Sequence, residues 1–116
     1  MATIPTELDL LAPFEIWEIP LERGAIIKFH APLVLQPQWM PDDPDEPSEQ
    51  KYLQIERPDL GISAYGTSRK ELWTSVRDDI LTLWREWVRK DDQDLTKLTQ
   101  KIKINYLSIA EEVIDE

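Results

Sequence analysis

The side chain best suited to acid–base chemistry in this chain is His30, because an imidazole ordinarily changes its charge near neutral pH. His30 is the only histidine, and the sequence contains no cysteine. A catalytic base needs a nucleophile or a second titratable group within hydrogen-bond reach, and the sequence offers His30 no cysteine, second histidine or triad order to join. We therefore expect His30 to be a structural or exposed strand residue, and we predict that the chain is not an enzyme and has no catalytic residue.

Residue patterns that bind phosphate or metal are also missing. The three glycines are too scattered along the chain to build a glycine-rich phosphate cradle. The acidic segment 42–49 lacks the alternating ligands and the central glycine of an EF-hand calcium loop. Weak divalent binding is one interpretation of this segment, and a solvated run of charges is the other. We predict no metal site and no cofactor.

The charge of the chain is its clearest functional signal. The formal net charge is −10, and most of the basic residues lie between residues 68 and 103, so the remainder is strongly acidic. Such a surface repels phosphate backbones, which predicts no autonomous binding of nucleic acid, and it attracts a basic protein partner. The alternative is that the acids only keep a small domain soluble. The predicted partner-binding residues are Asp42, Asp43, Asp45, Glu46, Glu49, Glu111 and Glu112.

The first half of the chain is predicted to form strands. Residues 1–13 form an N-terminal arm, and the aromatic and β-branched run 14–19 predicts a strand. Residues 20–24 have the proline and glycine of a hairpin turn. A second strand begins at residue 25 and runs to about 31, with a possible continuation to residue 35 in which Pro32 marks an edge or a break.

A long loop separates these strands from a second pair. Residues 36–50 hold four prolines among acids, which is typical of an exposed acidic, proline-rich loop. Strands are predicted at residues 51–57 and 62–65, and the turn Pro58-Asp59-Leu60-Gly61 joins them. Because strands lie on both sides of the loop, the loop is not a domain boundary. Residues 1–116 are predicted to be a single domain.

Two helices are predicted in the second half. Ser68 is a favourable N-cap for a helix over residues 68–89, and Glu71 completes a capping box by reaching back to the amide of Ser68. Its apolar residues recur at spacings of three and four. A second helix, antiparallel to the first, is predicted over residues 95–114 with Thr96 as its cap. Four tryptophans fall in predicted strands or helices, where we expect them to fill the core: Trp17, Trp73, Trp84 and Trp87.

Together these elements predict an α+β fold, in which an antiparallel sheet of three or four strands packs against a long helix and a second, C-terminal helix follows. The apolar face of the two helices is wider than one sheet needs. One interpretation is that the additional apolar side chains pack against the chain's own helix and sheet. The other is that the C-terminal helices of two copies pack together, which makes the protein a structural homodimer.

Residues 52–72 resemble the N-terminal domain of HicB-type antitoxins. The resemblance covers about residues 26–89 and rests on the run Tyr52-Leu53-Gln54-Ile55-Glu56-Arg57-Pro58-Asp59-Leu60-Gly61, the short strand that follows it, and the capped helix. It implies a partial RNase-H-like domain without nuclease residues, which binds and masks a small basic protein. Gly61-Ile62 stands where the family usually has Pro-Gly-Cys. A predicted helix also takes the place of the family's next strand and DNA-binding module, so operator binding is not expected.

The leading functional prediction is therefore a non-catalytic interaction module that resembles a HicB-like antitoxin and binds a basic protein. The homodimeric structural protein is the alternative. No apolar run approaches the length of a membrane span, and no secretory leader pattern is present at the N-terminus. Together with the absence of cysteine, this predicts a cytoplasmic protein with no membrane partner.

Overall fold

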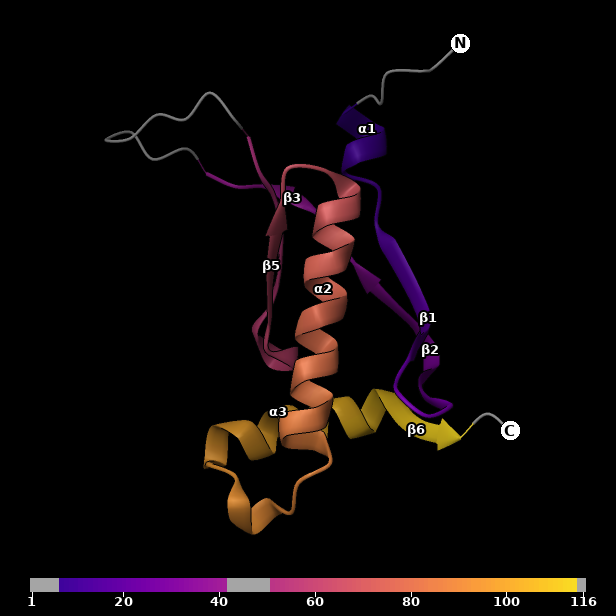
Figure 1. Cartoon of the computed structure of the whole chain (residues 1–116). Helices are drawn as coiled ribbons and strands as arrows, with labels where there is room; N and C mark the ends of the chain where they lie inside the picture. The colour runs from indigo at the N-terminus through magenta and orange to yellow at the C-terminus, as the bar shows by residue number, and fades with distance from the viewer. Residues whose placement is uncertain (1–6, 42–50, 115–116) are drawn as a thin grey trace.

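The computed structural model describes residues 7–41 and 51–114, and it shows the predicted α+β fold (Figure 1). The helices and strands follow one another along the chain as α1 (Glu7–Leu10), β1 (Phe14–Pro20), β2 (Ala25–Leu35), β3 (Gln38–Trp39), β4 (Leu53–Arg57), the 3-10 turn η1 (Pro58–Leu60), β5 (Ile62–Gly66), α2 (Arg69–Leu83), the π-helical turn η2 (Trp84–Val88), the 3-10 turn η3 (Asp92–Asp94), α3 (Lys97–Ile109) and β6 (Ala110–Ile114).

The strands divide into two antiparallel sheets of three, in the orders β1-β2-β6 and β3-β4-β5. The chain passes from the first sheet to the second directly, because β3 follows β2 after Gln36 and Pro37. Figure 1 shows α2 lying along both sheets. A single buried cluster joins residues of β1 and β2, such as Ile19 and Ile27, to residues of β4, β5 and α2. The two sheets therefore share one core.

The pairing of β1 with β2 is irregular at Trp17. Ile16 pairs with Leu33 and Glu18 pairs with Lys28, so Trp17 alone lies opposite residues 29–32 of β2. Pro32 belongs to this irregular stretch, which is the break that the sequence predicts there. A proline has no N–H to donate to a ladder, and irregular pairing of this kind changes which way the side chains point.

The long helix begins where the sequence predicts. The Ser68 hydroxyl accepts a hydrogen bond from the Glu71 amide at 3.1 Å. The Glu71 carboxylate, however, accepts from the amide of Thr67 at 2.7 Å and from the Thr67 hydroxyl, where the sequence had predicted the amide of Ser68. The helix continues from α2 into η2, where the Arg89 amide donates to the Trp84 carbonyl at 3.1 Å in the i to i−5 pattern of a π-helix.

The end of the chain differs from the prediction. Thr96 caps α3, accepting from the Thr99 amide at 3.2 Å, but the helix ends at Ile109 and β6 follows. The predicted helix over residues 95–114 is therefore wrong beyond Ile109, since β6 pairs with β2 instead. Figure 1 also shows α3 crossing the end of α2 and not running back along it, and α3 packs on η1 and η2.

The tryptophans are not equally buried. Trp84 is 1% exposed, and Trp73 and Trp87 pack partly buried against the core. Trp17 is 60% exposed, so the expectation that it fills the core is wrong. Of the N-terminal arm, α1 and the residues after it are described, and Leu11 packs against the core.

Candidate functional site

Most of the acidic residues predicted to bind a partner lie outside the described residues. These are Asp42, Asp43, Asp45, Glu46 and Glu49, all in the segment 42–50. The other two, Glu111 and Glu112, lie in β6 and not in a helical tail, and they have different surroundings. Glu111 is exposed opposite Lys28 of β2. Glu112 takes part in contacts within the chain.

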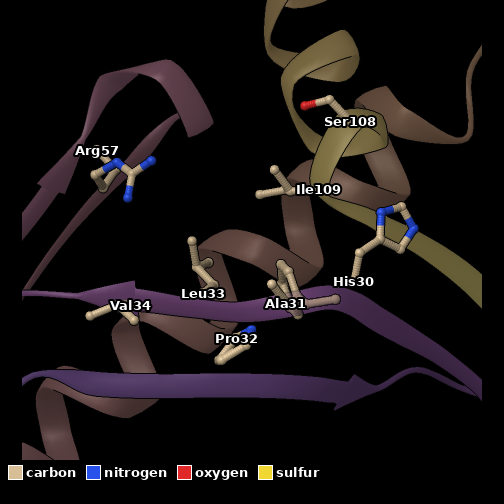
Figure 2. Close-up of a pocket in the computed structure, with 9 residues that line it drawn as sticks. His30, Ala31, Pro32, Leu33, Val34, Arg57, Ser108 and Ile109 are labelled. Atoms are coloured by element: carbon tan, nitrogen blue, oxygen red, sulfur yellow. The ribbon is translucent and has the colours of Figure 1, made fainter.

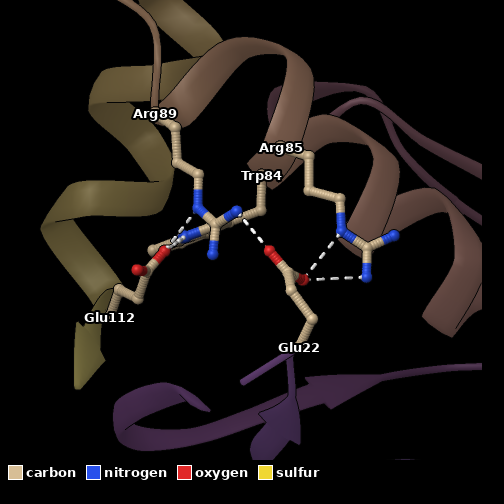
Figure 3. A network of polar contacts seen from close by, with 5 residues as sticks. All are labelled: Glu22, Trp84, Arg85, Arg89 and Glu112. Carbon is tan, nitrogen blue, oxygen red and sulfur yellow. Dashed lines mark hydrogen bonds and ion pairs between the residues drawn. The ribbon is translucent and has the colours of Figure 1, made fainter. Parts of the chain in front are cut away.

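Glu112 belongs to a polar network that joins three distant segments (Figure 3). Arg89 donates from Nε to Glu112 at 2.8 Å and from Nη1 to Glu22 at 2.6 Å. Glu22 also pairs with Arg85 at 3.1 Å, and the Trp84 indole donates to Glu112 at 2.7 Å. The network ties the β1–β2 turn and β6 to η2, whose extra residue per turn brings Trp84 and Arg89 to the same place.

The network also changes the acidity of both carboxyl groups. The hydrogen bond from Arg89 is the main cause that lowers the pKa of Glu22 to about 2. The same guanidinium lowers the pKa of Glu112 below its usual range. Both carboxylates are thus held ionised by charges within the chain. A partner that binds Glu112 has to compete with these contacts, and among the predicted residues that the structure describes only Glu111 is free of this competition.

A mixed apolar and acidic surface lies on the side of the first sheet that faces away from the core. Trp17 is 60% exposed and Val34 is 49% exposed. Three exposed carboxylates and one lysine lie on the same side of the sheet. Glu15 pairs with Val34, whereas Glu18 and Glu111 both pair with Lys28. We call these six residues, Glu15, Trp17, Glu18, Lys28, Val34 and Glu111, the Trp17 surface.

The opposite edge of the same stretch of β2 opens a pocket of about 310 Å³. Its apolar wall comes from residues of β2 and from Ile109, and its polar groups are His30, Arg57 and Ser108. Figure 2 shows Arg57 across the gap from His30, with Ser108 and Ile109 at the end of α3 and Ala31 on β2 between them. This is the size and the mostly apolar character of a small-molecule pocket.

The pocket exists because β2 continues beyond its pairing with β6. The strand β6 pairs with β2 only from Ala25 to Phe29, and β4 pairs with β3. Within the described chain, no strand pairs with this edge of β2 from His30 to Leu35. The strand β4 ends at Arg57 and β6 begins after Ile109, so both side chains lie at the rim of the uncovered edge.

The fold places His30 in the same pocket as Arg57 and Ser108, but no carboxylate of the described residues lines that pocket. The nine residues that line the pocket include no aspartate or glutamate. Within residues 7–41 and 51–114, no group of three or more His, Cys, Asp or Glu residues is placed to hold a metal ion. None of the helices in the same ranges has both the length and the apolar composition that crossing a bilayer requires.

Sequence reasoning missed both Trp17 and the pocket. One signal for Trp17 was present: Ile16 and Ile19 are three residues apart, whereas a regular half-buried strand places its apolar residues two apart. That spacing indicates an irregularity at Trp17. The pocket had no such signal, because His30, Arg57 and Ser108 come together only through the tertiary fold.

Comparison of the chain with protein-family models, with curated protein sequences and with solved structures found no match.

Proposed function

We propose that this chain is a non-catalytic interaction module that binds a basic protein on the Trp17 surface. The observation that carries the proposal is the placement of Trp17, a large aromatic side chain that is 60% exposed at an irregularity in the β1–β2 ladder. Tryptophan is enriched among the residues that dominate binding energy at protein interfaces. A partner that covers Trp17 and Val34 removes apolar area from water.

The charges of the Trp17 surface specify the partner. This surface carries three carboxylates, those of Glu15, Glu18 and Glu111, and one ammonium, that of Lys28, which lies opposite Glu18 and Glu111. The excess of negative charge has the same sign as the net charge of −10, so it steers a basic protein toward this face. The resemblance of about residues 26–89 to HicB-type antitoxin domains supports the same class of function, since those domains bind a small basic protein.

The test is a binding measurement with small basic proteins encoded beside the gene for this chain. Trp17→Ser is expected to raise the dissociation constant about tenfold or more. The matched control is Tyr65→Ser, because Tyr65 is 61% exposed on the other sheet and is not part of the Trp17 surface. The proposal fails if both serine variants bind alike, or if no such basic protein binds the native chain.

Charge reversal separates this face from the acidic loop. Glu15→Lys with Glu18→Lys is expected to slow association, and the effect should shrink as salt is added. The second variant reverses the four loop acids, namely Asp42, Asp43, Asp45 and Glu46. If the loop variant alone slows association, the partner uses the loop and not the Trp17 surface. An unchanged, salt-independent rate in both variants contradicts electrostatic steering.

The homodimer remains a second candidate because of the outer side of α3. Ile104 is 62% exposed, and Leu107, one turn further along the helix, is also exposed. Two copies of α3 packed together would remove both side chains from water. Sedimentation velocity at micromolar concentration tests this directly. A dimer that Ile104→Lys converts to a monomer supports it, and a native chain that sediments as a monomer excludes it.

A further inference from the structure

We infer that the pocket between β2, the end of β4 and the end of α3 binds a small carboxylic acid with an apolar body. This site shares only Val34 with the Trp17 surface, and it does not depend on the proposed protein partner. The inference rests on three observations: the polar groups at the rim, the open edge of Arg57, and the closed ends of the gap.

The polar groups of the pocket favour an anion. Arg57 and His30 line it together with Ser108, and no carboxylate of the described chain does. The Ser108 hydroxyl donates to the Asn105 carbonyl at 2.7 Å, so its oxygen still has capacity to accept. The wall beside these groups is apolar, with Phe29, Leu33 and Ile109 among its residues. A ligand that fits needs one charged end and a hydrophobic body.

The guanidinium of Arg57 has one edge in use and one edge free. Asp59 accepts from Nε at 3.0 Å and from Nη2 at 2.9 Å, which is a side-on, two-point ion pair. That pairing holds the planar group in one orientation. Within the part of the chain that the structure describes, Nη1 donates to no other group, so the Nη1–Nη2 edge is available for a second carboxylate. Two parallel N–H···O bonds are the arrangement that arginine and carboxylate prefer.

The shape of the gap selects a small molecule over a partner strand. An uncovered strand edge can accept an extended peptide, and β2 has such an edge beyond Phe29. Here β6 closes one end of the gap and β4 turns into η1 at the other, beside Arg57. The space of about 310 Å³ lies between these ends. It is therefore bounded along the strand direction, where a longer peptide would have to continue.

The experiment titrates the ¹⁵N-labelled full chain with three probes of similar size: phenylacetate, its neutral amide, and the cation phenethylamine. Phenylacetate is expected to shift the amides of Ala31, Leu33 and Ile109 and the Nε–H of Arg57. Its dissociation constant should be on the order of 1 mM, as for other compounds of this size. The amide and the amine should bind about tenfold more weakly or worse.

Three variants test the residues. Arg57→Gln is expected to weaken the binding of phenylacetate about tenfold. Arg77 is an exposed arginine of α2 that does not line the pocket, so Arg77→Gln should bind phenylacetate as the native chain does. Asp59→Asn removes the competing carboxylate and should tighten binding. Ala31→Leu fills the gap and should abolish binding, with the amide spectrum reporting that the fold is intact. Equal binding of the three probes, shifts elsewhere on the molecule, or an Arg57→Gln variant that binds normally would each overturn the inference.

Discussion

The network around Arg89 and the pocket beside Arg57 use similar side chains in opposite ways. At the network, both carboxylates and both arginines are engaged with one another, and the Trp84 indole also has an acceptor. At the pocket, Arg57 is held by Asp59 on one edge only, and His30 and Ser108 are among the lining residues. Polar groups that satisfy each other hold a fold together, and polar groups with spare capacity at a cavity are free to hold something else.

The two regions meet on β2. Its first half is covered on both edges, by β1 and by β6, and the turn that precedes it carries Glu22 into the network. Its second half is covered by β1 alone within the described chain, and it lines the pocket. The irregular pairing at Trp17 lies where the first half passes into the second. The same irregularity thus exposes Trp17 on one edge of β2 and adjoins the open pocket on the other.

The largest expected effect comes from removing the aromatic ring that the network anchors. Trp84 is buried and packs edge-on against Tyr106 with ring centroids 6.1 Å apart. Trp84→Ala should lower the free energy of unfolding by about 3 to 5 kcal/mol, measured by urea denaturation. Trp17→Ala is the matched control, and as an exposed substitution it should change stability by about 0.5 kcal/mol or less. Equal losses of stability in the two variants would show that burial does not determine how much each tryptophan contributes to the free energy of unfolding.

Much of the helical half follows from the sequence because its signals are local. Ser68 caps α2 and Thr96 caps α3 as predicted, since a cap depends on residues within one turn. The turn at Pro58 also forms as expected, and Gly61 has the positive φ of 66° that a residue with a side chain adopts at a cost.

The C-terminal strand could not be found in this way. Ala110, Val113 and Ile114 continue the three- and four-residue spacing of α3, so the local pattern fits a helix. Their partner is Ala25–Phe29 of β2, more than eighty residues earlier in the chain. Pairing with that edge overrides local preference, because a strand's stability is set by its neighbours. The pocket was hidden for the same reason, because its lining depends on where β6 begins.

A smaller loss is expected when the network loses its central charge. Arg89→Gln removes the ion pairs to Glu22 and Glu112 and leaves the two carboxylates near each other. Because these groups are partly exposed and screened, the free energy of unfolding should fall at pH 7 by clearly less than it does in Trp84→Ala. Arg77→Gln is the control, since Arg77 is exposed and its contact with Asp78 is 3.9 Å long.

Acid titration of the same pair checks the cause. Arg89 lowers the folded-state pKa of Glu22 to about 2 and also lowers that of Glu112. A carboxyl group whose pKa is lower in the folded chain than in the unfolded chain stabilises the fold at pH values above its unfolded-state pKa. That contribution is lost as the pH falls through the folded-state pKa. The stability difference between the native chain and Arg89→Gln should therefore narrow between about pH 4.5 and pH 2. A difference that stays constant over this range would mean that Arg89 acts through packing and not through charge.

The smallest stability effect is expected at the pocket, and it sharpens the contrast between the two regions. His30 is exposed at the rim, so His30→Asn should change the free energy of unfolding by about 0.5 kcal/mol or less. The same substitution alters a polar residue that lines the pocket, so it should change the affinity for phenylacetate while stability stays constant. Arg89→Gln should show the reverse, with lower stability and unchanged affinity. If His30→Asn instead destabilised the chain as much as Arg89→Gln does, the polar rim of the pocket would be part of the scaffold, and the distinction between the regions would fail.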